Sequence, residues 1–405
     1  MKRQLQKLVL GLLLFIGFTT IAFAQWQNVG TAGFSGGMVE YTSLAIDDNG
    51  VQYVAFRDQA NSFKATVMKF NGTSWENVGA AGFSTGAVKY TSLAISGNGV
   101  LYVAYQDVAN SNKATVMKFS GSTWDSVGVT GFSAGAVEAT SLALSSSGVP
   151  YVAFYDVANS FKATVMKFDG FSWQTVGSAG FSAGTVEYPS MAISSNGEPF
   201  VAYQDQGNSY KATVMKFNQT SWETVGTAGF SSGEANYTSL AINSSGVPYV
   251  AFRDAANSNK TTVMMFNGGS WEVVGSAGFS AGSANNVSLS INNIGTPYVA
   301  YQDAGNSSKA TVMKFDGTTW DSVGITGFSA GAVFAVSLSI SGNGVPMIAY
   351  RDAGNAYKAT VMQFIDPTSG VHDITLMNRD VYPNPTNGFV TIDNLPIGTV
   401  VTSLT

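Results

Sequence analysis

A tryptophan recurs every 49 residues along most of this 405-residue chain, and this period constrains the fold more than any other feature. Two further patterns recur seven times with the same period. The first is Ser-Leu/Met-Ala/Ser-Ile/Leu, which begins at Ser43 in the first unit, and the second is Lys-Ala/Thr-Thr-Val-Met, which begins at Lys64. A fixed period of this length predicts a repeat architecture, in which one supersecondary unit stacks against its own copies. Each tryptophan opens the pattern Trp-x-x-Val-Gly, and the copies stand at Trp26, Trp75, Trp124, Trp173, Trp222, Trp271 and Trp320.

Each repeat predicts four short β-strands. In the first unit these span about residues 43–46, 52–57, 65–70 and 75–78, with Asn- and Gly-containing turns inside the first and last pairs. The strands are almost continuously apolar, which indicates that both faces of each sheet are covered. Only 11% of the residues are charged and 45 are glycine, which suits tight turns. We therefore expect an all-β fold, a seven-bladed β-propeller of four-stranded blades over residues 25–365.

The phase of the repeats predicts how the ring closes. Counted from Ser43, six units are complete, whereas the seventh ends at Phe364 without a Trp-x-x-Val-Gly strand. A spare copy of that strand stands at residues 26–30. We predict that this N-terminal strand pairs as the outermost strand of the seventh blade, which leaves no unpaired edge in the ring.

Residues 1–24 have the three parts of a secretory signal peptide. A basic start precedes an apolar run over residues 8–18, and Ala22-Phe23-Ala24 forms a cleavage site. The alternative is a membrane anchor, but the run is short because a spanning helix needs about 20 apolar residues. We expect cleavage before Gln25 and no membrane span afterwards. Cleavage takes three positive charges from a chain of net charge −5, which leaves −8 and no basic footprint for nucleic acid.

The composition changes after Phe364, and we expect a linker and the start of a tail over residues 366–380. The following segment, residues 381–405, contains a turn motif made of Tyr382, Pro383, Asn384, Pro385, Thr386, Asn387 and Gly388. This motif resembles the type A C-terminal sorting domain of the type IX secretion system of Bacteroidetes. Members of that family continue through further strands, so we expect residues 381–405 to form a partial domain.

The resemblance implies passage through the periplasm by the type IX secretion machinery, followed by release or attachment at the outer cell surface. The alternative interpretation of the same residues is a proline-fixed turn between two strands.

The composition also excludes several kinds of chemistry. The chain has no cysteine, and its single histidine, His372, lies in the tail. Disulfides, thiol catalysis, a histidine triad and a multi-histidine metal site are therefore excluded from the repeats. We expect no metal and no cofactor. The alternative is calcium bound by the Asp- and Asn-containing loops, although no loop has the EF-hand spacing.

An aspartate and a lysine six residues apart occur in every repeat. We interpret the aspartate, Asp58 in the first unit, as an acceptor of backbone N–H groups in the turn between the second and third strands, facing Lys64. The alternative is a ring of charge around the axial mouth. Because both residues occur in every repeat, we favour the structural interpretation.

Residues that differ between repeats, near that aspartate and lysine, are the candidate binding residues. Aromatic rings beside guanidinium and amide groups are typical of sugar-binding surfaces. The alternative is ordinary variation on a solvated rim. The candidates are Arg57, Phe63, Tyr155, Phe161, Tyr210, Arg253, Arg351 and Tyr357.

These features predict a binding protein rather than an enzyme. A glycosidase or lyase needs one acid and base pair set apart from the rest, and here the acids recur from repeat to repeat. We expect a multivalent binder of a glycan or surface polymer, since weak repeated sites gain avidity. The alternative is a protein-binding or adhesive scaffold at the cell surface.

Overall fold

The computed structural model describes residues 24–366, 381–383 and 390–392. Residues Gln25–Ile365 form one compact unit. The expected signal peptide, save Ala24, lies outside the described residues, as do most of the linker and tail. No helix among the described residues is long and apolar enough to cross a bilayer.

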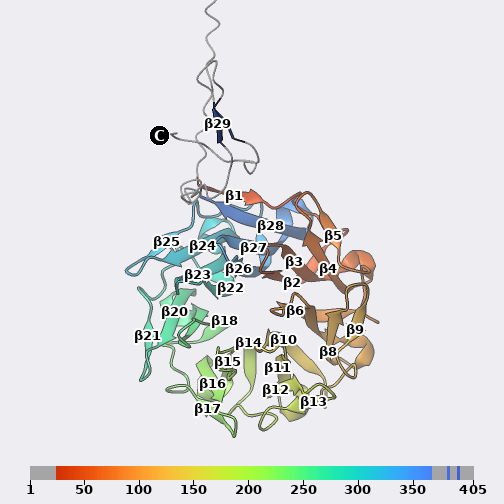
Figure 1. The fold of residues 1–405 in the computed structure, drawn as a ribbon. Coiled ribbons are helices and arrows are strands. Elements are labelled where there is room, and N and C mark those ends of the chain that lie inside the picture. The colour runs from red at the N-terminus through yellow and green to blue at the C-terminus, as the bar shows by residue number, and fades with distance from the viewer. Residues whose placement is uncertain (1–23, 367–380, 384–389, 393–405) are drawn as a thin grey trace, which may run out of the picture. The chain divides into compact units, whose positions relative to one another are not determined.

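Seven antiparallel four-stranded sheets form a ring, which confirms the predicted propeller (Figure 1). Within each blade we name the strands A to D from the axis outward. The A strands are β2 (Val39–Ile46), β6 (Val88–Ile95), β10 (Val137–Leu144), β14 (Val186–Ile193), β18 (Ala235–Ile242), β22 (Ala284–Ile291) and β26 (Val333–Ile340). The B strands are β3 (Gln52–Asp58), β7 (Leu101–Asp107), β11 (Pro150–Asp156), β15 (Pro199–Asp205), β19 (Pro248–Asp254), β23 (Pro297–Asp303) and β27 (Pro346–Asp352).

The outer half of each blade is a second hairpin. The C strands are β4 (Lys64–Phe70), β8 (Lys113–Phe119), β12 (Lys162–Phe168), β16 (Lys211–Phe217), β20 (Lys260–Phe266), β24 (Lys309–Phe315) and β28 (Lys358–Ile365). The D strands are β5 (Trp75–Asn77), β9 (Trp124–Ser126), β13 (Trp173–Thr175), β17 (Trp222–Thr224), β21 (Trp271–Val273), β25 (Trp320–Ser322) and, for blade 7, β1 (Gln25–Asn28).

A single turn of 3-10 helix joins strand B to strand C in every blade. These turns were not foreseen from the sequence. They are Gln59–Asn61, Val108–Asn110, Val157–Asn159, Gln206–Asn208, Ala255–Asn257, Ala304–Asn306 and Ala353–Asn355.

The ring closes through the N-terminal strand, as predicted. Strand β1 pairs antiparallel with β28, with Gln25 opposite Ile365 and Asn28 opposite Met362. The indole of Trp26 donates to the carbonyl of Val323 in blade 6 at 2.7 Å. The other six tryptophans make the same bond to the preceding blade at 2.7–2.8 Å, so the outer rim is a closed ring of such bonds.

The inner strands are joined by a second closed ring of hydrogen bonds. The backbone N–H of Leu93 in blade 2 donates to the hydroxyl of Ser43 in blade 1 at 3.0 Å, and the last bond runs from Leu44 to Ser337. The seven such bonds measure 2.9–3.0 Å. These bonds fix each A strand against its neighbour around the axis.

Strand A begins four residues earlier than the sequence suggested, at Val39 in blade 1. A β-bulge between Glu40 and Ser43 interrupts its pairing with strand B, and Tyr41 takes a left-handed backbone conformation with φ 52°. A bulge inserts an unpaired residue into a strand and so breaks the regular pattern that sequence reasoning relies on.

In the tail, β29 (Val381–Pro383) pairs antiparallel with β30 (Val390–Ile392). Tyr382 and Pro383 therefore lie on a strand. The rest of the turn motif lies outside the described residues, and its resemblance to a sorting domain stays a prediction.

Candidate functional site

All eight candidate binding residues lie at one end of the ring, which we call the B–C face. It is formed by the ends of the B strands, the 3-10 turns and the starts of the C strands. Four candidates stand one residue before the end of a B strand: Arg57, Tyr155, Arg253 and Arg351. The other four stand directly before a C strand: Phe63, Phe161, Tyr210 and Tyr357. The structure brings them together in pairs in blades 1, 3 and 7 and leaves Tyr210 and Arg253 in separate blades.

The aspartate of each turn holds the B–C face in shape. Asp58 is 3% exposed, and its carboxylate accepts from the backbone N–H of Ala60 at 3.0 Å and from the Asn61 amide and the Thr66 hydroxyl at 2.8 Å each. The Thr66 hydroxyl in turn accepts from the N–H of Gly82 in the loop to the next blade, at 2.9 Å. All seven blades repeat this relay, so the aspartate is a structural residue.

The recurring lysine plays no part in that relay. Lys64 pairs with Asp58 across the strands, but the two make no ion pair within the described part of the chain. The backbone donor to the aspartate is as expected, whereas the asparagine and threonine donors were not foreseen from the sequence, and the expected lysine contact is not an ion pair.

The 3-10 turn ends in two consecutive left-handed residues. In blade 1 these are Ser62, with φ 56°, and Phe63, with φ 62°. The second position holds Asn112, Asn259 and Ser308 in blades 2, 5 and 6, and asparagine is among the residues that tolerate this conformation best. Four blades instead carry an aromatic ring there, at a conformation that costs an L-residue roughly 1–2 kcal/mol. These rings, Phe63, Phe161, Tyr210 and Tyr357, are 36–42% exposed.

Three of these rings contact a neighbouring side chain. The guanidinium of Arg57 lies 4.2 Å from the centroid of Phe63 and is ion-paired with Glu40. The rings of Tyr155 and Phe161 are tilted against each other with centroids 5.4 Å apart.

In blade 7, the Arg351 guanidinium lies 4.5 Å from the Tyr357 centroid. Tyr210 has no ring stacking or cation contact among the described residues, which leaves it open to solvent.

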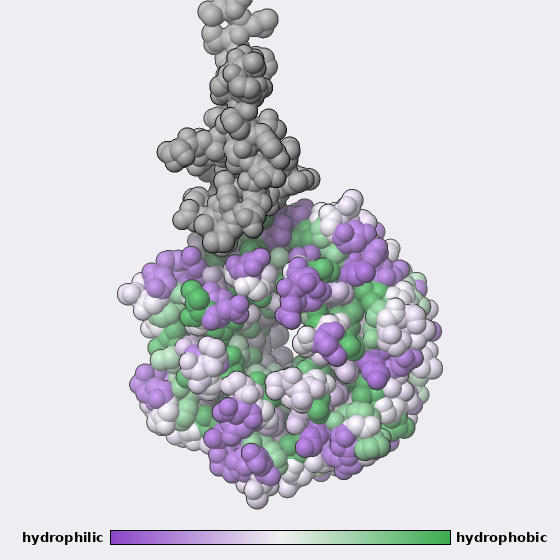
Figure 2. Space-filling model, in the orientation of Figure 1, coloured by the Kyte–Doolittle hydropathy of each residue, from purple (hydrophilic) through white to green (hydrophobic). Residues whose placement is uncertain are grey.

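Further tyrosines stand at the bulges of the A strands, nearer the axis. Tyr41 and Tyr90 have ring centroids 4.8 Å apart, as do Tyr188 and Tyr237. Burial, then the neighbouring Tyr41 and the charge of Glu138, raises the pKa of Tyr90 to about 12. These residues were not among the candidates because nothing in an apolar strand marks which residue will form a bulge. Figure 2 shows one face of the ring hollowed at its centre, with polar and apolar residues interspersed around the hollow.

Three cavities lie at the opposite end of the described ring, between neighbouring blades, where no ligand was expected from the sequence. The cavity between blades 1 and 2 has a volume of about 670 Å³ and is lined by Tyr53, Lys69, Tyr102 and Lys118, among others. The cavity between blades 5 and 6 measures about 740 Å³. In that cavity a methionine, Met265, stands where Lys69 stands in blade 1.

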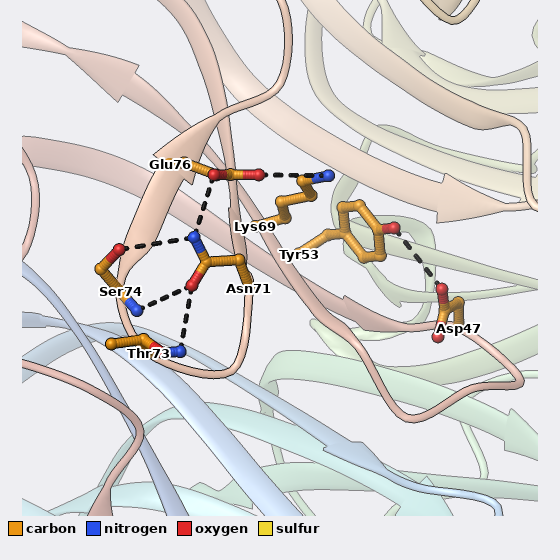
Figure 3. Close-up of polar contacts among 7 residues, drawn as sticks. All are labelled: Asp47, Tyr53, Lys69, Asn71, Thr73, Ser74 and Glu76. Carbon is orange, nitrogen blue, oxygen red and sulfur yellow. Dashed lines mark hydrogen bonds and ion pairs between the residues drawn. The ribbon is translucent and has the colours of Figure 1, made fainter.

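A polar network braces the turns beside the first of these cavities (Figure 3). The Asn71 side chain accepts from two N–H groups of its own turn and donates to Glu76 at 3.0 Å. Lys69 forms an ion pair with Glu76 at 3.2 Å, and Tyr53 donates to Asp47 at 3.4 Å. The hydrogen bonds from Asn71 and then from Lys69 lower the pKa of Glu76. Two of the polar side chains that line this cavity, Tyr53 and Lys69, are therefore engaged with neighbouring carboxylates.

No protein-family model and no curated protein matches the sequence. An ulvan lyase, a polysaccharide lyase bound to -[GlcA(1-4)Rha3S]-, is similar with a TM-score of 0.55 and 12% identity over 81% of this chain and 94% of that chain. A protein of unknown function from Dyadobacter fermentans has a TM-score of 0.49 and 12% identity, covering 84% and 99% of the two chains.

A lectin from Aleuria aurantia, in complex with Fucalpha1-6GlcNAc, has a TM-score of 0.48 and 17% identity, covering 73% and 99%. At such identities a likeness shows the fold alone. The seven four-stranded sheets arranged in a closed ring make this chain a seven-bladed β-propeller, and the likeness to the ulvan lyase agrees with this fold.

Proposed function

We propose that this protein is an exported, non-catalytic binder of glycans or surface polymers that uses the B–C face. The observation that carries the proposal is the set of aromatic rings at left-handed turn positions. A bulky ring at such a position is disfavoured by the backbone, and three blades hold Asn or Ser there instead. A side chain that persists at this conformational cost, while more than a third exposed, serves something other than the fold.

The exposed rings suit a sugar ligand. A flat apolar surface packs against the C–H face of a sugar ring, and the amide and guanidinium groups beside it bond hydroxyls. The rings recur around the B–C face, so one polymer chain can contact several of them and gain avidity from individually weak contacts. The ulvan lyase indicates that a protein of similar fold can hold a polysaccharide.

The state of the acids supports a non-catalytic role. The seven turn aspartates are at most 3% exposed and are hydrogen-bonded within the relay, which removes them as general acids or bases. Glu40 is engaged by Arg57.

The signal-like N-terminus and the sorting-type motif support export through the periplasm to the outer surface, with the type IX secretion machinery as a partner. The second candidate function, a protein-binding or adhesive scaffold, would use the same face and is an outcome of the test below.

The test is a glycan array probed with the purified protein, with and without calcium. We expect specific binding that weakens in the Tyr155→Ala, Tyr210→Ala and Tyr357→Ala variants. The matched control is Phe171→Thr, which removes a 93% exposed ring at the other end of blade 3 and installs the residue of blade 1. A blank array with folded protein would contradict the glycan proposal and favour the scaffold.

The same array also checks the location of the site. Tyr102→Ala and Lys118→Gln alter the cavity between blades 1 and 2 and leave the B–C face intact. If these two variants lose binding while the three tyrosine variants keep it, the ligand binds between the blades and the B–C face is the wrong surface.

A further inference from the structure

The propeller carries three arginines at equivalent positions, which allows one blade to be compared with another. Arg57, Arg253 and Arg351 each stand one residue before the end of a B strand, in blades 1, 5 and 7. The Nε atom of each is buried and has no hydrogen-bond partner. The three arginines therefore share a buried, unpaired Nε atom. They differ in which group contacts the rest of the guanidinium.

In blades 1 and 5 the chain itself supplies a partner. Arg57 donates to the carboxylate of Glu40, the residue opposite it on strand A, and forms an ion pair with it. Arg253 donates through Nη1 to the side-chain oxygen of Asn285 in the next blade at 3.0 Å. An arginine in this setting thus takes an acceptor either from its own blade or from the neighbouring one.

In blade 7 both kinds of partner are missing among the described residues. Phe334 stands opposite Arg351, where Glu40 stands opposite Arg57. Seen from blade 7, the position in the next blade that matches Asn285 is Glu40, whose carboxylate is already engaged by Arg57. Arg351 makes no hydrogen bond and no ion pair within the described part of the chain.

Two aromatic rings hold the Arg351 guanidinium in place instead. Its central carbon lies 4.5 Å from the centroid of Tyr357 and 5.6 Å from that of Phe334. Cation–π contacts of this kind fix a guanidinium without satisfying its N–H donors. A half-buried cation held rigid, with donors free and no anion supplied by the chain, is prepared for an anion from outside.

We propose that Arg351, framed by Phe334 and Tyr357, binds the acid group of an anionic glycan, either a carboxylate or a sulfate. This inference rests on the proposed function and names the ligand class for one place on the same face. A planar guanidinium binds such a group through two parallel N–H donors. Blade 1 carries its own carboxylate, and Arg253 in blade 5 is bonded to Asn285 and has no cation–π contact among the described residues. The described ring therefore has one arginine that is both framed by rings and without an acceptor. The acidic unit of a polymer would dock there, in blade 7, while other units lie on the aromatic rings of other blades.

The repeats offer variants that copy a native blade and should therefore fold. Phe334→Glu gives blade 7 the carboxylate of blade 1 and fills the site from within. Arg351→Gln installs the residue that stands there in blades 2, 4 and 6, Gln106, Gln204 and Gln302. Lys167→Gln removes one positive charge elsewhere and controls for net charge, with a glutamine native to blade 7 at Gln363.

The test is calorimetric titration of the full protein with four probes: an oligouronate, a sulfated oligosaccharide, a neutral oligosaccharide of the same length, and an oligoglutamate peptide. We expect the acidic sugars to bind more tightly than the neutral one. Phe334→Glu and Arg351→Gln should each weaken the binding of the acidic sugar by about 10- to 100-fold, the loss of one charge-assisted contact. Lys167→Gln should leave it unchanged. The carboxylated and sulfated probes identify which acid group the site takes.

The outcomes separate the two proposals. If Tyr210→Ala weakens sugar binding while Phe334→Glu and Arg351→Gln do not, the inference is overturned and the proposed function stands. If no sugar binds but the oligoglutamate binds through Arg351, the ligand is an acidic protein and both glycan proposals fail. As a gain of function, Glu40→Phe should free Arg57 and raise the number of acidic-sugar sites per ring from one to two. Unchanged stoichiometry in a folded Glu40→Phe variant would contradict the inference.

Discussion

At the left-handed residue before strand C, the side chain proposed to bind the ligand is also one that the backbone conformation disfavours. Tyr210 holds φ 60° while its ring stands 42% exposed with no ring partner among the described residues. Blades 2 and 5 hold Asn112 and Asn259 at the same position and conformation. The comparison bears mainly on the ring, because the surrounding turn has the same backbone conformation in all three blades.

We predict that Tyr210→Asn raises the free energy of unfolding by about 1 kcal/mol, since asparagine tolerates this backbone conformation better than tyrosine. The same substitution should weaken glycan binding. Chemical denaturation and the glycan array measure the two effects on one sample. The reverse change, Asn112→Tyr, should lower stability by a similar amount. A loss of stability in Tyr210→Asn would show that the ring packs for the fold and is no binding residue.

Four core tyrosines make the fold sensitive to high pH. Tyr105, Tyr203, Tyr301 and Tyr350 are each 1% exposed, and burial, then the charge of the nearby turn aspartate, raises the pKa of each above the value of 10 that the unfolded chain has. Blades 1, 3 and 5 hold Phe56, Phe154 and Phe252 at this position.

Because the folded pKa is raised, the unfolded chain loses these protons first, and stability falls once the pH exceeds 10. Once the pH is well above 10, each tyrosine should remove about 1.4 kcal/mol of stability per pH unit, or about 5–6 kcal/mol per pH unit for the four. Denaturation series between pH 9 and pH 12 measure this slope. Tyr105→Phe, which copies a native blade, should reduce the slope by the contribution of one tyrosine, about 1.4 kcal/mol per pH unit. An unchanged slope in that variant would contradict this origin.

At the scale of the element, each blade is locked by one relay of polar groups. Asp205 accepts from the Thr213 hydroxyl at 2.9 Å, and this hydroxyl accepts from the N–H of Gly229 at 2.9 Å. The relay joins strand B, strand C and the loop to the next blade. It therefore shapes the B–C face.

We predict that Asp205→Asn lowers the free energy of unfolding by about 2–4 kcal/mol, because the new amide presents N–H donors to the N–H and O–H donors around it. Thr213→Val should cost less, about 1–2 kcal/mol, since it removes one member and leaves the carboxylate its other bonds. Urea denaturation followed by tryptophan fluorescence measures both. Equal losses in the two variants would contradict the central place of the aspartate.

The strands and turns that recur in every repeat were predictable from the sequence. The β-bulge, which departs from the regular alternation of a strand, was not. The turns around Asn71 and the Trp75 strand follow from residue type and spacing alone. The bulge at Tyr41 does not, because an apolar strand looks the same with or without an extra residue. The candidate residues of the B–C face were located by their position next to the aspartate. The cavities at the other end depend on the gap between two blades, which the sequence of one blade does not specify.

At the scale of the whole molecule, the blade number followed from a period that never slips, and the closure followed from the spare N-terminal strand. That strand is the fourth strand of blade 7 and carries Trp26, which is 8% exposed. The ring of Trp26 stacks on that of Phe328, with the two centroids 4.2 Å apart. The ring is thus completed by residues more than 300 positions apart.

We predict that deleting residues 25–30 exposes the edge of β28 and makes the protein self-associate, because an unpaired strand edge recruits another strand. Analytical ultracentrifugation should show dimers or larger species, and a synthetic peptide of residues 25–30 added in excess should restore the monomer. The control is Gln27→Ala, which changes an exposed side chain on the same strand and keeps the pairing. A deletion variant that stays monomeric would show that β1 does not guard the edge.

The pairing of β1 with β28 also decides how the ring responds to tension. Gln25 and Ile365 are opposite each other at the start of the ladder, which runs inward to Asn28 and Met362. A force that separates these two ends therefore breaks the hydrogen bonds of the ladder one after another. It does not load all of them at once in shear. A pull on Ile365 alone, resisted by a ligand held on the ring, bypasses that weak opening because β28 is also bonded to β27. We therefore expect the propeller to open at a lower force when it is stretched between its own ends than when it is pulled at one end against a bound ligand.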